Sequence, residues 1–368
     1  MSISFPAITD DQQAMALALQ QAERGMYTTT PNPRVGCVIV REQRVIGAGF
    51  TQPPGGNHAE IEALHDAQAN GHDVRGATVY VTLEPCSHFG RTPPCADALI
   101  RAGVGRVVSA IGDPNPLVAG RGLERLKAAG IDVSSGVLRD AAHAINIGFF
   151  TRMQRGTPWV RMKSAASLDG KTALHNGKSQ WITGQAARDD GHVWRARACA
   201  ILTGIGTVRG DDPQLNVRAI ATPRQPRRIV IDSKLALSPA AKVVSGGGTW
   251  VFTASDDRQK HALLEAAGAE VIVAANADGK VDLPQVMQEL GKRQINELHI
   301  EAGSKLNASL LREHCVDELL LYLAPRLLGD ARDMFDLPAL DDLAGSLELR
   351  FHEVKQIGAD LRILARFT

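Results

Sequence analysis

Hydrophobic and polar positions follow two recurring patterns along the chain. In one, apolar residues stand three or four positions apart, which is typical of an amphipathic helix; the other is a short apolar run, typical of a buried strand. Since strands that alternate with helices form a sheet covered on both faces, the first part of the chain predicts an α/β domain. The helical pattern covers 10–24, 58–69, 94–102, 123–129 and 140–153, and the apolar runs cover 35–40, 44–49, 77–83, 106–111 and 131–137.

A polar break containing Gly and Pro, Gln154 to Pro158, interrupts this alternation, which then starts again. Because 368 residues are too many for one ordinary core, we expect two domains, 1–156 and 157–368. Two final strand patterns follow one another without a helix between them, which predicts an antiparallel edge on the second sheet. The strands expected in the second domain are 159–165, 200–203, 228–232, 249–253, 269–273, 297–301, 318–323, 347–355 and 361–367.

The composition argues against several classes of protein. Lys and Arg total 41 and Asp and Glu total 40, a net charge of +1, so no nucleic-acid partner is expected. Five cysteines are too few for a secreted protein held by disulfides. Residues 1–10 lack a basic segment followed by an apolar one, and no apolar run approaches the ~18 residues of a membrane span. We therefore expect a cytoplasmic protein with no membrane partner.

Three side chains of the kind that bind zinc follow one another in the first domain: His58, Cys86 and Cys95. Together they supply three zinc ligands and leave a fourth position open to water, as catalytic zinc sites do. Glu60 stands two positions after His58, and positions i and i+2 of a helix do not face each other. We therefore expect His58 to bind the metal, while Glu60 carries protons between zinc-activated water and the substrate.

This order matches the zinc-deaminase signature, His-x-Glu followed by Pro-Cys-x-x-Cys, except for one spacing. The eight residues from Ser87 to Pro94 separate the two cysteines, where two residues are usual. Any one of these side chains could be an ordinary surface histidine or a buried free cysteine. The ordered set, with a strand leading into Pro85 and a helix starting near Cys95, favours the zinc site.

Three motifs carry a resemblance to a known family: TPNPRVG over 30–36, HAE over 58–60, and TLEPCSHFGRTPPC over 82–95. They resemble the deaminase half of the bifunctional riboflavin-biosynthesis deaminase–reductase family, in which the long loop between the cysteines is normal. The resemblance implies a cytidine-deaminase-like three-layer α/β/α fold. It also implies one Zn²⁺ on His58, Cys86 and Cys95, with Glu60 as the catalytic proton shuttle.

Other polar residues of these motifs are candidates for substrate binding. Asn32 lies in a Pro-Asn-Pro turn, where Asn is common, and its amide could also bind a sugar or ring edge. The resemblance favours substrate contact at Asn32. His88 and Arg91 lie between the two cysteines and either meet a substrate phosphate or brace the loop. Cys37, inside a strand pattern, is expected in the core.

The second domain contains neither a Gly-x-Gly-x-x-Gly fingerprint nor a Gly-x-x-x-x-Gly-Lys-Ser/Thr loop. Its glycine-containing turn at 302–304, after a predicted strand, leaves backbone N–H groups free for a phosphate. Its motifs are KSAASLDGK over 163–171, SQWI over 179–182, ILTGIGTV over 201–208, DDPQLNVR over 211–218 and AGSKLNAS over 302–309. Together they resemble the reductase half of the same family, whose α/β fold is similar to dihydrofolate reductase.

The resemblance implies a role for individual positions of this domain. Arg195 and Arg218 suit a ribose phosphate, because a guanidinium group is a forked donor. Lys163 is a further substrate candidate, for the sugar oxygen or for the phosphate. Implied NADPH contacts are Ala165, Trp181, Thr207, Asp211, Ser233, Gly303, Ser304, Lys305, Leu306, Asn307, Ala308 and Ser309. Implied substrate contacts are Ser179, Arg195, Leu215, Arg218 and Glu301.

The family implies two consecutive reactions on one phosphorylated aminopyrimidine. The first hydrolyses the 2-amino group of 2,5-diamino-6-(5-phosphoribosylamino)pyrimidin-4(3H)-one, and the second reduces the ribosyl chain with NADPH. We expect a homo-oligomer. The sequence does not indicate a preference for NADPH over NADH, nor whether the intermediate is channelled.

Two other functions use part of the same pattern. One is a nucleic-acid deaminase with the same zinc chemistry, which the near-neutral charge and the long cysteine loop disfavour. The other is a binding or regulatory protein with a degenerate reductase half.

Overall fold

The computed structural model describes residues 7–87, 93–116 and 119–368, so His88 and Arg91 lie outside the described residues. The chain divides into two compact units, 1–155 and 156–368. Among the described residues, no helix is both long and apolar enough to cross a membrane. The five cysteines are free thiols.

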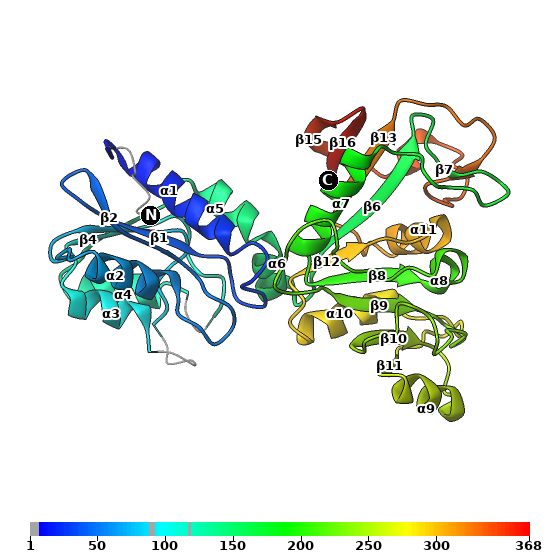
Figure 1. The fold of residues 1–368 in the computed structure, drawn as a ribbon, viewed down its shortest axis with the longest axis horizontal. Coiled ribbons are helices and arrows are strands. Elements are labelled where there is room, and N and C mark those ends of the chain that lie inside the picture. Colours follow the sequence, from blue (N-terminus) through cyan, green and yellow to red (C-terminus); the bar gives the residue numbers. More distant parts are fainter. Residues whose placement is uncertain (1–6, 88–92, 117–118) are drawn as a thin grey trace. The chain divides into compact units, whose positions relative to one another are not determined.

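The first unit has a five-stranded sheet in the order β2-β1-β3-β4-β5. Strand β1 is antiparallel to β2 and β3, whereas β3, β4 and β5 are parallel. Helices α1 and α5 lie on one face of the sheet and α2, α3 and α4 on the other (Figure 1), so the expected three layers are confirmed. The elements are α1 (Asp11–Arg24), β1 (Gly36–Arg41), β2 (Arg44–Phe50), α2 (Ala59–Ala69), β3 (Thr78–Val81), α3 (Cys95–Ala102), β4 (Arg106–Ser109), α4 (Arg121–Ala128), β5 (Asp132–Ser135), α5 (Arg139–Ile145) and α6 (Ile147–Arg155).

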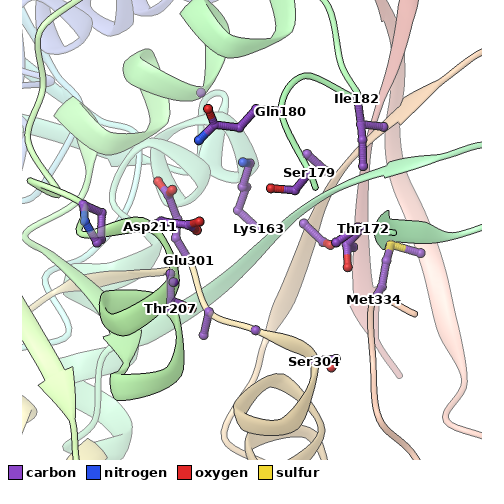
Figure 2. Close-up of a pocket in the computed structure, with 18 of the residues that line it drawn as sticks. Lys163, Thr172, Ser179, Gln180, Ile182, Thr207, Asp211, Glu301, Ser304 and Met334 are labelled. Atoms are coloured by element: carbon purple, nitrogen blue, oxygen red, sulfur yellow. The ribbon is translucent and has the colours of Figure 1, made fainter. Parts of the chain in front are cut away.

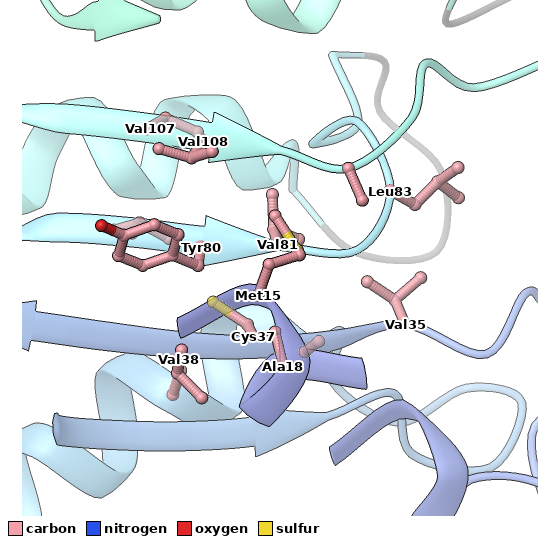
Figure 3. Close-up of a cluster of buried hydrophobic side chains, with 14 of the residues drawn as sticks. Met15, Ala18, Val35, Cys37, Val38, Tyr80, Val81, Leu83, Val107 and Val108 are labelled. Atoms are coloured by element: carbon pink, nitrogen blue, oxygen red, sulfur yellow. The ribbon is translucent and has the colours of Figure 1, made fainter. Parts of the chain in front are cut away.

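The hydrophobic core of this unit includes side chains from helices on both faces of the sheet, and one part of it lies between α1 and the sheet. Figure 3 shows Met15 and Ala18 of α1 against Cys37 of β1 and Val81 of β3, and all four side chains are fully buried. The expectation that Cys37 belongs to the core is confirmed. Helix α1 approaches β1 so closely that a Cβ at Gly36 would lie 1.9 Å from the carbonyl oxygen of Ala18. A larger residue at Gly36 would therefore push the helix off the sheet.

The sequence prediction was wrong about the segment 140–153, which is two helices and not one. Helix α5 ends at Ile145 with Asn146 as its C-cap, and α6 begins at Ile147. The amide of Asn146 is buried and bonds to the main chain of Arg34: Oδ1 accepts from the Arg34 N–H at 2.7 Å, and Nδ2 donates to the Arg34 carbonyl at 2.8 Å. A contact with a residue 112 positions away thus accompanies a break that helical periodicity could not indicate.

The second unit has a nine-stranded sheet in the order β11-β10-β9-β8-β12-β6-β13-β16-β15. The strands from β11 to β13 in that order are parallel, and β16 and β15 add an antiparallel edge, as the sequence predicted. The pair β7–β14 was not predicted. The elements are β6 (Trp159–Ser167), β7 (Lys171–Ala173), α7 (Gln185–Arg197), β8 (Ala200–Gly204), α8 (Ile205–Asp211), β9 (Arg227–Ile231), β10 (Thr249–Thr253), α9 (Arg258–Ala266), β11 (Ala269–Val273), α10 (Leu283–Lys292), β12 (Glu297–Ile300), α11 (Ser304–Arg312), β13 (Glu318–Ala324), β14 (Arg332–Asp333), a 3-10 turn (Leu343–Gly345), β15 (Leu349–Ile357) and β16 (Asp360–Phe367).

Candidate functional site

The predicted zinc ligands come from one edge of the first sheet. Because β1 is antiparallel to both neighbours, its first residues lie beside the last residues of β2 and β3: Gly36 pairs with Phe50, and Cys37 with Val81. The segment that follows β2 leads to His58, and the segment that follows β3 leads to Cys86. The antiparallel order of β1 therefore brings two distant motifs to the same edge.

Three ligand atoms converge at this edge. The Nδ1 atom of His58 lies 3.6 Å from Cys86 Sγ and 3.3 Å from Cys95 Sγ, and the three side chains form a group able to hold a metal ion. With Zn–S bonds of about 2.3 Å and a Zn–N bond of about 2.0 Å, a tetrahedral site puts sulfur and nitrogen about 3.5 Å apart. The observed distances fit zinc, with His58 Nδ1 as the ligating nitrogen.

The Cys86 thiol is also prepared for metal binding. A hydrogen bond from the Cys95 thiol, together with His58, lowers the pKa of Cys86. The backbone N–H of Cys95 donates to Cys86 Sγ at 3.3 Å. Since zinc binds the thiolate form of cysteine, these contacts favour the ligating state.

Glu60 lies in the first turn of α2, beside the three ligands. It is 4% exposed, and burial, with Cys86 adding to the effect, raises the pKa of Glu60 to about 7. A carboxyl group that titrates near neutrality is suited to both accepting and releasing a proton. The helix that carries it is held close to β2, because a Cβ at Gly49 would lie 2.6 Å from the Ala59 carbonyl oxygen and 2.5 Å from the Ala63 nitrogen.

A buried carboxylate that the sequence analysis missed shapes the segment before Cys86. Glu84 accepts hydrogen bonds from the backbone N–H groups of Asp113, Gly120 and Gly122, at 3.2, 2.9 and 2.9 Å. Gly122 also packs closely, since a Cβ there would lie 1.9 Å from the Pro85 carbonyl oxygen. Glu84 thereby ties the Pro85–Cys86 turn to the segment that follows β4.

Asn32 lies in the turn before β1, at the same edge of the sheet. Its backbone N–H donates to the Thr29 carbonyl at 2.9 Å, and its side chain is half-buried. The turn is anchored from behind by Arg34, whose Nε and Nη1 donate to the carbonyls of Met26 and Ile145 at 3.2 and 2.9 Å. The Asn32 side chain has no contact that would assign it a purely structural role in the described part of the chain.

The second unit contains a cavity of about 2050 Å³ where β6, β8 and β12 end. Carboxyl ends of parallel strands are the usual place for a ligand in an open α/β sheet. Figure 2 shows Lys163 of β6 and Glu301, the residue after the neighbouring strand β12, facing this space, with Ser179 and Thr207 beside them. Most of the predicted contacts line the cavity: Lys163, Ala165, Ser179, Trp181, Arg195, Thr207, Asp211, Leu215, Arg218, Glu301, Gly303, Ser304, Lys305, Leu306 and Asn307.

Three of the predicted cofactor contacts do not line this cavity: Ser233, Ala308 and Ser309. Ser233 follows β9, and its hydroxyl accepts from the Val281 N–H at 3.1 Å. Ala308 is fully buried in α11, and the Ser309 hydroxyl donates to the Lys305 carbonyl at 3.1 Å. Their side chains are engaged by the protein itself.

Arg195 and Glu301 form a two-point ion pair at the cavity, 2.5 Å from Nε to Oε1 and 2.7 Å from Nη2 to Oε2. Arg195 Nη1 also donates to the Asn216 carbonyl at 3.0 Å. His299 is fully buried behind the pair, with Nε2 3.2 Å from Glu301 Oε1. The charge of Arg195 is therefore largely compensated, which the assignment of Arg195 as a phosphate clamp did not foresee.

Other charged groups at the cavity are less restrained. Lys163 and Arg218 have no carboxylate within ion-pair distance in the described residues, and burial lowers the pKa of Lys163.

Two apolar residues of the cavity have unusual surroundings or backbone conformation. Trp181 is 60% exposed, so it is not a core residue, and the Arg188 guanidinium stacks 4.5 Å from its ring centre. Leu215 lines the cavity with a backbone φ of +49°, a conformation that is costly for a branched residue.

Comparisons with known proteins match both units of the chain. The family model described as "Cytidine and deoxycytidylate deaminase zinc-binding region" matches residues 8–111, and that described as "RibD C-terminal domain" matches residues 158–363. The chain is 46% identical over 365 residues to "Riboflavin biosynthesis protein RibD" of Escherichia coli, covering 95% of this chain and 98% of that protein. The protein of the same name from Haemophilus influenzae is 45% identical and covers 95% of each chain.

Solved structures are similar over almost the whole chain. The Acinetobacter baumannii RibD structure, form 1, has a TM-score of 0.88 at 43% identity, covering 97% of this chain and 99% of that one. A Thermotoga maritima structure described as a diaminohydroxyphosphoribosylaminopyrimidine deaminase/5-amino-6-(5-phosphoribosylamino)uracil reductase has a TM-score of 0.87 at 32% identity, with the same coverage. The cytidine-deaminase-like and reductase folds expected from the sequence are confirmed.

Proposed function

The chain belongs to the RibD family of bifunctional riboflavin-biosynthesis enzymes, and from this premise we propose how its residues divide the two reactions. It is an aminopyrimidine deaminase that uses zinc and a reductase that uses NADPH. We assign the deamination to residues 1–156 and the reduction to residues 157–368. The convergence of His58 Nδ1, Cys86 and Cys95 beside the buried Glu60 is the observation that carries the assignment.

In the first reaction, the substrate is 2,5-diamino-6-(5-phosphoribosylamino)pyrimidin-4(3H)-one, and its 2-amino group leaves as ammonia. His58, Cys86 and Cys95 would hold zinc, which when bound acts as a Lewis acid and makes water nucleophilic at neutral pH. Glu60 accepts a proton from the attacking water and delivers protons to the ring nitrogen and to the departing amine. The C–N bond breaks as the carbonyl forms. Asn32 orients the substrate from the turn before β1.

In the second reaction, the ribosyl chain is reduced to ribityl. NADPH supplies the hydride when it is bound. We assign its binding to cavity residues that include Trp181, Thr207 and Ser304, with the N-terminus of α11 available to a phosphate. Ser233, Ala308 and Ser309 stay cofactor candidates that rest on the resemblance alone.

The substrate of this reaction is held by a different set of residues. Arg218 is exposed to the cavity, and its charge is free to bind the phosphate. Lys163 hydrogen-bonds the sugar oxygen that gains a proton, while Leu215 packs against the ring. Ser179 and the Arg195–Glu301 pair complete the substrate site.

We also propose a cytoplasmic location and a homo-oligomeric state. Zinc ligation by Cys86 and Cys95 needs reduced thiols, which the cytoplasm maintains. Strand β15 is an edge strand exposed along nearly its whole length, with Phe351 71% and Val354 54% exposed. An exposed apolar edge is suited to pairing with a second copy. Equilibrium sedimentation of wild type and F351K would test this assembly.

One coupled assay tests the proposed function. The purified protein is given the phosphorylated diaminopyrimidine and NADPH, and ammonia and NADP⁺ are followed together. We expect ammonia without NADPH, and NADP⁺ only once deaminated product has formed. Deamination of an RNA hairpin but not of the free aminopyrimidine would contradict the proposal. A failure of the deaminated intermediate to oxidise NADPH would also contradict the proposal.

A further inference from the structure

His192 is a titratable residue of the reductase cavity to which none of the roles above applies. It lies on α7 one helical turn before Arg195, and both side chains line the cavity. Residues three positions apart lie on the same face of a helix, so the two side chains project together. His192 is only 8% exposed.

The imidazole of His192 has no hydrogen-bond partner within the described chain. Its Nδ1 atom is fully buried and unpaired. Its Nε2 atom is not among the buried unpaired atoms and forms no bond to the described residues, so Nε2 is the nitrogen that the cavity can reach. Buried polar atoms are almost always paired, because an unpaired one destabilises the fold. An apolar side chain would be more stable at this position unless a ligand uses the imidazole.

The surroundings determine which hydrogen-bonding role is open to this ring. Burial first, then Arg195 and Arg218, lower the pKa of His192 to about 4, against the opposite effects of Glu301 and Asp189. The ring is therefore neutral at physiological pH and donates from a single nitrogen. Since an orphaned buried N–H is rarer than an orphaned acceptor, the proton belongs on Nε2.

We propose that His192 is a further substrate-binding residue of the reductase, which donates a hydrogen bond from Nε2–H to an oxygen of the phosphorylated sugar chain. This inference rests on the proposed function of the cavity. An oxygen acceptor is the partner that a neutral donor needs. The cationic Arg218 near the ring attracts the phosphorylated part of the substrate rather than its base. The Nε and Nη2 groups of Arg195 already donate to Glu301, so few of its N–H groups are left for the substrate. His192 supplies an additional donor at this place.

Three variants separate this role from a structural one. Gln can place an N–H group near the position of Nε2, Asn places its amide near Nδ1, and Leu has no donor. We expect H192Q to keep the KM for the deaminated intermediate within about threefold. H192N and H192L should raise that KM on the order of tenfold, as expected for one lost hydrogen bond. The kcat and the KM for NADPH should change less than twofold.

Stability and a control variant guard against misfolding. Because Leu removes an unpaired buried nitrogen, we expect H192L to unfold at a temperature equal to or above that of wild type. Val193, the exposed neighbour outside the cavity, provides the control V193A, which should leave the KM unchanged. Calorimetric titration with ribose 5-phosphate, without NADPH, measures binding apart from turnover and should show the same order of variants.

The same variants locate the acceptor oxygen. The KM values of the variants and wild type are then compared with the dephosphorylated intermediate as substrate. If the difference in KM disappears, the hydrogen bond from His192 goes to the phosphate. If the difference persists, the bond goes to a sugar hydroxyl. Equal KM values for H192Q, H192N and H192L overturn the inference. If wild type itself fails to oxidise NADPH with the deaminated intermediate, the proposed function fails instead, and the two failures are therefore distinguishable.

Discussion

Arg195 and Glu301, 106 positions apart in sequence, face each other in a two-point ion pair at the reductase cavity. Burial acts to raise the pKa of Glu301, but Arg195 outweighs this effect and holds the pKa well below its ordinary value. The sequence prediction assigned these two residues to the substrate separately, but in the structure they form one ion pair. Its rigidity presents the remaining N–H groups of Arg195 in a fixed direction.

Glu301→Gln should destabilise the reductase unit by about 3 kcal/mol, because it leaves a largely buried guanidinium without its counter-charge. Urea denaturation at neutral pH measures this loss. The Glu301 carboxylate has a lower pKa folded than unfolded, so its contribution is fully present above the unfolded value of 4.5 and is lost as the pH falls below it. The stability difference between wild type and E301Q should therefore narrow below pH 4.5. A difference that is constant or grows there would contradict the pairing.

Glu60→Gln should lower the rate of ammonia release by a factor on the order of 10²–10⁴, while the zinc content stays at one per chain. Glu60 moves protons and is not a ligand. Glu62 is a matched control in the same helical turn, since its carboxylate accepts from Asn57 Nδ2 at 2.8 Å. E62Q should retain deamination. Loss of zinc from E60Q, measured by atomic absorption, would show that the role is wrongly assigned.

Removal of zinc by a chelator should stop ammonia release but not the oxidation of NADPH by the deaminated intermediate. The two sites lie in separate units, and none of the described residues that line the reductase cavity is a zinc ligand. Chelation should also make Cys86 reactive toward a thiol reagent, because it is the half-buried cysteine of the described residues, whereas Cys37, Cys95, Cys199 and Cys315 stay protected by burial. Loss of both activities together would indicate that zinc maintains the fold of the whole chain.

Asn146→Ala should raise the KM of deamination severalfold and lower the stability of the first unit by about 2 kcal/mol, because two buried hydrogen bonds to Arg34 are lost. Asn146→Asp keeps the acceptor for the Arg34 N–H and loses only the donor to the Arg34 carbonyl. The stability of N146D should therefore lie between that of wild type and that of N146A. Chemical denaturation and steady-state ammonia assays give both quantities. An unchanged KM in N146A would mean that this contact does not position the turn of Asn32.

Much of this protein was readable from local patterns. Periodicity placed most strands of both units, and the helices of the first unit, within a few residues, whereas the helices α7 to α10 of the second unit were not predicted. The order of His58, Glu60, Cys86 and Cys95 was enough to predict a zinc deaminase, although the spacing of the cysteines departs from the general signature. The antiparallel edge of the second sheet followed from two strand patterns without a helix between them.

What the tertiary structure decided depends on contacts between distant residues. Helical periodicity runs through Asn146, and only its bonds to Arg34 explain the break there. Nothing in the local sequence distinguishes Glu84 from other acidic residues. Its role comes from three backbone N–H groups in the segment after β4, which donate to its carboxylate. His192 reads as an ordinary helical position, and its unpaired nitrogen exists only because α7 lies against the cavity. Local sequence determines which chemistry is available, and the packing of distant segments determines which groups are paired, charged or left free to bind.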